Sequence, residues 1–349
     1  MSTPPSETAG SRPGLWTRTA KIIAAVTAVI TLVLGAHQVA TRFGGYLEQR
    51  REASTLTKVA RQQAARGDFA EAWASAERAA ALADSEELDT LRVEVAFAWL
   101  EEGRPGPGKT FRTITDTVTP ALDHALAKAQ GERRADILAH LGWAAFLRSR
   151  DGIAGDPTTR YEEALAIDTG NVYANAMLGH WLMWRGGTVD SASERFATAL
   201  ARANAGQRPI VRRLQLAALM NQGTAGEAKL FQVVNEMRER GEALDARTAD
   251  RVFAIYAHRY GPRDTPRRPG DDLLPPPAAG AVFEWILQTH GTGQRSAVVS
   301  AFVRSTLQEA AGERAAALES LRELERTGQL SAPQREQVKR AIARLNSAR

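Results

Sequence analysis

The amino-acid sequence predicts an all-α protein made of paired helices and preceded by one membrane-spanning helix. Residues that favour helices, chiefly alanine, glutamate, arginine and leucine, make up much of the chain. Segments beyond residue 50 resemble one another with a period of about 34 residues, which is typical of stacked helix–turn–helix repeats. An uncharged apolar run also lies near the N-terminus, over residues 22–36.

The composition limits the classes of function. The chain has 349 residues, with 45 basic and 40 acidic side chains and a net charge of +5. This near balance predicts no nucleic-acid partner, because such partners are bound by strongly basic surfaces. The absence of cysteine excludes disulfides, thiolate metal sites and a cysteine nucleophile. Abundant alanine and arginine are consistent with a bacterial source.

The N-terminal segment is expected to anchor the chain in a membrane. Residues 1–20 begin with a polar, proline-containing stretch that favours a disordered tail. We expect residues 21–42 to form the transmembrane helix, since the apolar run and its flank supply the roughly 20 residues that cross a bilayer. Trp16 and Tyr46 flank this segment, as interfacial aromatic residues do.

A cleaved signal peptide and a buried core helix are the two alternatives to this anchor. A signal peptide would be cut after small residues at positions −3 and −1. Cutting after Ala36 places Leu34 at −3, and cutting after Ala40 places Gln38 there, so neither site fits. A buried core helix is disfavoured because the run is apolar on every face.

The orientation of the anchor has two readings. The C-terminal flank has slightly more basic residues, which favours a cytoplasmic body under the positive-inside rule. A short basic tail before a single apolar run instead favours transfer of the body across the membrane. We favour the second reading, with the body on the periplasmic or extracytoplasmic side of the cell (inner) membrane.

The clearest repeat runs from Tyr161 to Leu200. Its first half carries bulky residues beside a glycine, and its second half carries alanine, an aromatic residue and alanine at intervals of four and three. Small residues let paired helices approach closely, and bulky residues fill the adjacent holes. The residues concerned are Leu178, Gly179 and Leu182 in the first helix, and Ala192, Phe196 and Ala199 in the second.

On these residues the segment resembles the tetratricopeptide repeat (TPR) family. The resemblance implies an α-solenoid of antiparallel helix pairs whose first helices line a concave groove for a peptide. Weaker units follow the same pattern. They involve Gly67, Ala72, Ala76 and Ala79; Leu141, Gly142 and Ala145 with Tyr161 and Ala164; Leu216, Leu219, Gly223 and Ala228; and Gly312, Ala317, Leu321 and Leu324.

These units predict repeats over residues 50–260 and a C-terminal helical block over 281–349. A proline-rich loop over 261–280 should separate the two blocks, because it holds six of the 15 prolines. A second interruption is expected between Gly103 and Thr119. Residues 333–347 are expected to form a polar capping helix.

By the same resemblance, a partner protein or peptide would meet aromatic and apolar residues of the first helices, with two arginines beside them to pair with its carboxylates. The alternative is that several of these side chains simply pack between repeats. The apolar and aromatic residues are Trp143, Phe146, Tyr173, His180, Met183 and Trp184, and the arginines are Arg148 and Arg185.

One motif suggests a nucleotide-binding protein instead. Residues 103–110 match the phosphate-loop pattern GxxxxGK[ST], in which Lys109 would reach phosphates. The alternating stretch RVEVAFAWLEE before it could be the strand that such a loop requires. Against this, Pro105 and Pro107 remove two amide donors, and no second strand ending in aspartate follows. We therefore expect a turn between helices here.

No other pattern indicates catalysis. The six histidines show no HExxH spacing, although His140 and His180 fall in neighbouring repeats and could line one groove. The arginines of the segment RYGPRDTPRRPG are expected to be solvated, with acidic lipid or an acidic partner as alternatives. The sequence thus predicts a membrane-anchored scaffold that is not an enzyme and uses no metal or cofactor. An accessory factor for an envelope-assembly enzyme is the narrower alternative.

Overall fold

The computed structural model describes residues 32, 44–83, 85–105, 110–261, 274–291, 297–326 and 330–347. These residues form helices and their connections, with no strand among them, which confirms the all-α prediction. The predicted tail over 1–20 and the predicted transmembrane helix over 21–42, apart from Leu32, lie outside the described residues. Within the described ranges, no helix combines the length and the apolar character that crossing a membrane requires.

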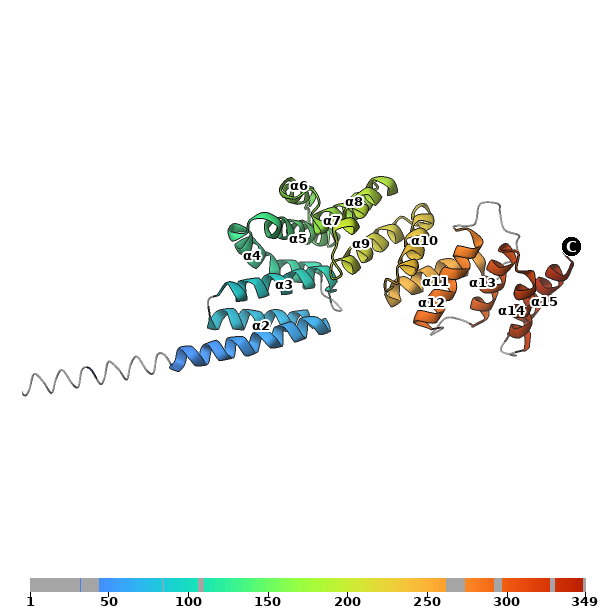
Figure 1. Cartoon of the computed structure of the whole chain (residues 1–349), viewed down its shortest axis with the longest axis horizontal. Helices are drawn as coiled ribbons and strands as arrows, with labels where there is room; N and C mark the ends of the chain where they lie inside the picture. Colours follow the sequence, from blue (N-terminus) through green and yellow to red (C-terminus); the bar gives the residue numbers. More distant parts are fainter. Residues whose placement is uncertain are drawn as a thin grey trace, which may run out of the picture. The chain divides into compact units, whose positions relative to one another are not determined.

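The chain divides into two units, whose helices Figure 1 labels. The first contains a helix over residues 44–66, α2 (Phe69–Leu82), α3 (Glu86–Glu102) and Pro120–Ala125 of α4 (Phe111–Lys128). The second contains Thr110–Thr119 and the chain from Leu126 onward.

In the first unit, α2 packs against α3. The predicted turn before α2 is confirmed, since Gly67 has a φ of 83°, a conformation that glycine adopts without strain. Ala72, Ala76 and Ala79 are fully buried, as the repeat pattern predicts. Arg92 of α3 reaches back to Glu77 of α2 with a 2.7 Å ion pair.

The second unit begins with consecutive helix pairs. In each pair a helix packs against the next one along the chain, and short connections make the two antiparallel. The helices α5, α7 and α9 also contact one another in series, as Figure 1 shows. The pairs are α5 (Gly131–Arg150) with α6 (Thr158–Ile167), α7 (Val172–Trp184) with α8 (Val189–Arg202), and α9 (Arg208–Asn221) with α10 (Thr224–Glu239).

The second unit continues with five more helices, which are α11 (Ala246–Tyr260), α12 (Pro276–His290), α13 (Ala297–Ala310), α14 (Arg314–Arg326) and α15 (Ala332–Ser347). Helix α11 contacts α12 and α13, and α13 pairs with α14. The last helix, predicted over 333–347, packs against α14 and buries Val338 and Leu345.

Two predicted interruptions are shorter than expected. The turn expected between Gly103 and Thr119 ends before α4, because Ile114, Val118 and Leu122 bury one face of a helix that begins at Phe111. The loop expected over 261–280 ends at Pro276, where α12 begins. Proline is tolerated in a first helical turn, since the amide that it lacks has no intrahelical partner there.

Glycine and aromatic residues set the distance between helices in the best repeats. A Cβ atom added to Gly142 of α5 would lie 2.6 Å from Cε1 of Tyr161 in α6. One added to Gly179 of α7 would lie 3.2 Å from Cε2 of Phe196 in α8. Tyr161, Phe196 and Phe231 follow at intervals of 35 residues, and all three are buried. The small-to-bulky packing predicted for these repeats is therefore confirmed.

The prediction for one residue of the weaker units is wrong. Ala228 was expected at a packed position of α10 but is exposed. Gly226 makes the close contact instead, because an added Cβ would lie 2.3 Å from the carbonyl oxygen of Leu219.

We predict that Gly142→Ala destabilises the second unit by about 1–3 kcal/mol, since the added methyl group overpacks a buried tyrosine ring. The melting temperature of the purified full-length chain should fall accordingly. Gly280→Ala is the matched control, because an added Cβ there meets nothing within 4 Å and alanine favours helix. Equal melting temperatures for the two variants would contradict this account.

Candidate functional site

Four of the predicted groove residues belong to the core. Trp143, Phe146, His180 and Met183 are between 0% and 6% exposed, and they belong to α5 and α7, which contact each other. The His180 ring lies 5.2 Å from the Trp143 ring and 5.1 Å from the Phe146 ring, centroid to centroid. Their expected place on an open surface is therefore corrected. Aromatic rings on facing sides of two contacting helices gain more from one another than from water.

The two histidines expected in one groove are also buried. His140 is fully buried, and its Nδ1 lies 2.7 Å from the carbonyl oxygen of Asp136. Tyr173, which is half-buried, packs edge-on against the His140 ring at 4.6 Å. Among the described residues, no cluster of three or more histidine or acidic side chains is placed to hold a metal ion.

Trp184 is the predicted aromatic residue that remains accessible, with 44% of its surface exposed. It is the last residue of α7, and its ring lies 5.5 Å from the buried ring of Phe146. The guanidinium carbon of Arg150 lies over the Trp184 ring at 5.6 Å and over the Phe111 ring at 5.0 Å. Arg150 is the last residue of α5, so the ends of three helices meet here.

Sequence reasoning missed Arg150 and Phe111. The signal for Arg150 was its position four residues after Phe146, which places both on one face of α5. Nothing in the sequence indicated that Phe111 would approach, because Phe111 lies within the turn expected between Gly103 and Thr119.

The two predicted arginines already have carboxylate partners. Arg148 lies 3.6 Å from Asp116, and Arg185 lies 3.7 Å from Asp156. A ligand carboxylate would have to compete with these aspartates. We call the group formed by Phe111, Arg148, Arg150, Trp184 and Arg185 the Trp184 surface.

Burial controls the protonation of His180 beneath this surface. Desolvation lowers the pKa of His180 to about 4, and the positive charge of Arg150 lowers it further. Its Nδ1 atom is buried with no hydrogen-bond partner among the described residues. The neutral imidazole is thus the form that the folded protein holds.

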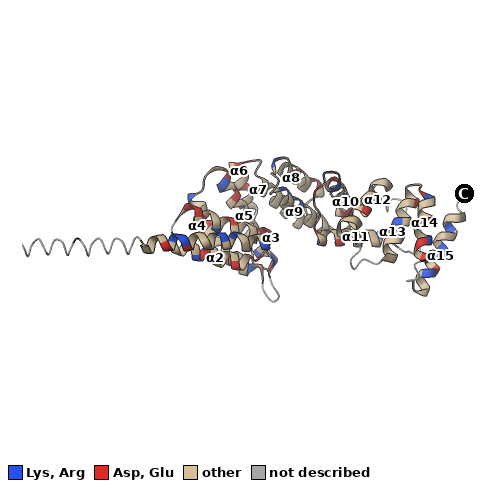
Figure 2. Cartoon of the chain, turned by 60° about the horizontal axis from the view of Figure 1, so that its bottom comes forward, with Lys and Arg blue, Asp and Glu red and all other residues tan. Residues whose placement is uncertain are grey.

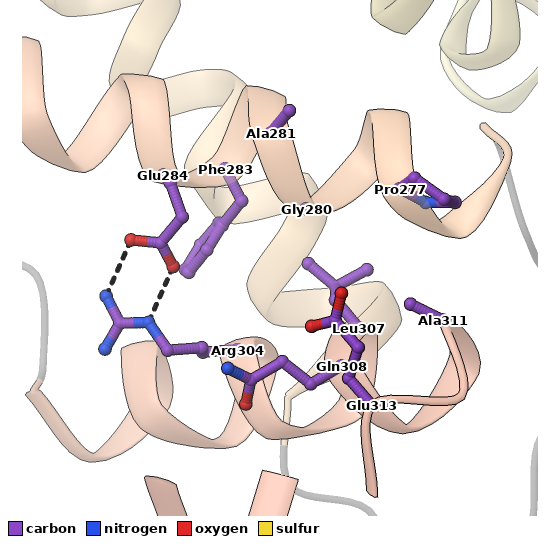
Figure 3. A pocket seen from close by; sticks show the side chains of 10 residues that line it. All are labelled: Pro277, Gly280, Ala281, Phe283, Glu284, Arg304, Leu307, Gln308, Ala311 and Glu313. Carbon is purple, nitrogen blue, oxygen red and sulfur yellow. Dashed lines mark hydrogen bonds and ion pairs between the residues drawn. The ribbon is translucent and has the colours of Figure 1, made fainter. Parts of the chain in front are cut away.

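A smaller slot lies between α12 and α13 (Figure 3). Phe283 and Leu307 form its apolar wall, and Gly280 leaves one side open. At one end Arg304 donates two hydrogen bonds to Glu284, at 2.6 and 2.9 Å. This slot is closed to anions because its arginine is already paired.

The charges and the phosphate-loop motif point to no further site. Basic and acidic residues are interspersed along the helices (Figure 2). The stretch RVEVAFAWLEE, considered as a strand before a phosphate loop, lies within helix α3. The strand that a phosphate loop requires is therefore not formed there. Lys109 lies outside the described residues.

The sequence matches no protein-family model, and no curated protein is significantly similar to it.

We predict that His180 makes the folded state sensitive to acid. The unfolded chain binds a proton near pH 6.5 and the folded chain only near 4, so this contribution is complete above pH 6.5 and lost as the pH falls to 4. Integrated over that interval, the effect is about 3 kcal/mol in the free energy of unfolding. Urea denaturation at several pH values should show this loss in wild type and not in His180→Phe. Parallel pH profiles for the two proteins would refute the assignment.

Proposed function

We propose that this protein is a non-catalytic, membrane-anchored scaffold that binds a protein or peptide partner through a TPR-like α-solenoid. Successive helix pairs with first helices α5, α7 and α9 in series support the solenoid. Closely approached glycines at Gly142 and Gly179 support the TPR resemblance. The anchor rests on the uncharged apolar run over 22–36.

The observation that carries the binding role is the exposure of Trp184. Trp184 is 44% exposed beside buried aromatic residues, so part of its ring is available to a partner. Tryptophan is enriched at the energetic centres of protein interfaces, because it covers a large area at little conformational cost. Phe146 supports the ring from below, so the side chain is held in place before a partner arrives.

Anchoring has a physical consequence for such a scaffold. A partner held at the same membrane meets the solenoid at a raised effective concentration, so weak contacts suffice. A partner that is itself an envelope-assembly enzyme would make this chain an accessory factor on the extracytoplasmic side.

We predict that Trp184→Ala abolishes capture of the partner. A proximity-labelling enzyme fused after Arg349 should mark a reproducible set of proteins in cells, and the variant should lose most of that labelling. Truncating an interface centre costs about 2 kcal/mol or more, which is roughly 30-fold in affinity.

The matched control is Ile167→Ala, which removes a similarly exposed apolar side chain (42%) from the end of α6. Labelled envelope proteins would support the extracytoplasmic body, and labelled cytoplasmic proteins the opposite orientation. Labelling that is the same with and without Trp184 would overturn the assignment of this surface.

We also predict that deleting residues 1–43 releases the chain from membranes. The full-length chain should sediment with membranes and resist an alkaline carbonate wash, because an apolar span of about 20 residues inserts stably. The shortened chain should remain in the supernatant. Sedimentation of the shortened chain with membranes would count against the anchor.

A further inference from the structure

Arg150 is held by aromatic rings, and no carboxylate among the described residues of the second unit pairs with it. Its guanidinium carbon lies 5.0 Å from the centre of the Phe111 ring and 5.6 Å from that of Trp184. No ion pair or hydrogen bond of its guanidinium occurs among the described residues of the second unit. The rings hold the cation in place without supplying the acceptor oxygens that its N–H groups can bind.

The neighbouring arginines differ in this respect. Arg112 lies 3.0 Å from Asp116, and the same aspartate lies 3.6 Å from Arg148. Arg185 lies 3.7 Å from Asp156. Among the described arginines of this surface, Arg150 is therefore the one that a carboxylate can approach without displacing an aspartate from an ion pair.

A guanidinium held in this way is suited to a carboxylate. Its planar fork matches the two oxygens of aspartate or glutamate. The rings already restrict the long side chain, which reduces the entropy that binding would cost. The exposed part of the Trp184 ring, directly beside it, offers an apolar contact to the next residue of a ligand.

From these contacts, and resting on the proposed scaffold function, we propose that Arg150 binds an aspartate or glutamate side chain of an acidic partner segment. Trp184 then packs against an apolar residue beside that carboxylate. The partner is thus recognised by an acidic residue next to an apolar one in an accessible stretch of chain.

The surroundings favour a peptide over a polyanion. Asp151 accepts a hydrogen bond from the Arg112 amide at 2.7 Å, so three aspartates lie at this surface with four arginines. The phosphates of a nucleic acid or an anionic bilayer would meet these aspartates repeatedly and be repelled. One carboxylate on a flexible chain can approach Arg150 alone.

A purely structural role for Arg150 makes a different prediction. A cation in the last turn of α5 stabilises the helix dipole, which would change the melting temperature and no binding constant. The test therefore measures both quantities on the same proteins.

The experiment uses the full-length chain in lipid nanodiscs and a displayed library of short random peptides as the probe. Wild type should enrich peptides with aspartate or glutamate beside an apolar residue. For the best peptide, Arg150→Gln should weaken binding roughly 10- to 100-fold, since charge-assisted hydrogen bonds are lost. Replacing the peptide's acidic residue by its amide should cause a similar loss, with little further loss when both changes are combined.

Two variants serve as controls. Arg78→Gln removes an exposed arginine of α2 and should leave binding unchanged. Arg150→Lys keeps the charge without the planar fork and should bind with intermediate affinity, which separates recognition from misfolding if Arg150→Gln melts early.

Several outcomes would overturn the proposal. They are enrichment of peptides without acidic residues, enrichment of none, or equal affinities for Arg150→Gln and Arg78→Gln. Binding to phosphatidylglycerol vesicles that depends on Arg150, without peptide enrichment, would assign the surface to lipid instead. If Arg150→Gln still labels the Trp184-dependent partners in cells, this inference fails while the scaffold function stands.

Discussion

The close approach of paired helices is the constraint on which the described structure depends. The helices can approach closely because a glycine lies opposite an aromatic ring of the next helix. Gly142 lies opposite Tyr161, and Gly179 lies opposite Phe196. Each pair then buries a bulky side chain completely, and the burial of apolar area is the main favourable term in folding. The next pair stacks on the first helices of the previous one, so the core extends along the chain.

Because of this packing, the accessible aromatic and cationic side chains of these helices lie at the helix ends. Because α5 and α7 contact each other, Phe146 and His180 lie between them and are unavailable to a partner. Trp184 and Arg150 occupy the last positions of the same helices, where part of the Trp184 ring remains exposed. A scaffold of this kind would therefore recognise its partner at a rim of aromatic and cationic residues.

Burial and charge are coupled at that rim. His180 stays neutral because its surroundings are apolar and because a guanidinium lies above it. A neutral ring adds no positive charge to compete with Arg150 for anions. Arg148 and Arg185 are each ion-paired with an aspartate, whereas Arg150 forms no ion pair with the described residues of the second unit.

The sequence by itself determined the helical class, the glycine–aromatic packing of the best repeats and the final helix, because these depend on local propensity and on residues at fixed spacing. Tertiary structure alone decided which groove candidates were accessible. The sequence pattern of an aromatic residue on a first helix is the same whether its side chain faces a neighbouring helix or water. It also decided the environment of Arg150. Phe111 contacts Arg150 from the start of α4, where the preceding prolines had suggested a turn. Such contacts arise between segments whose order in the chain does not predict their distance in space.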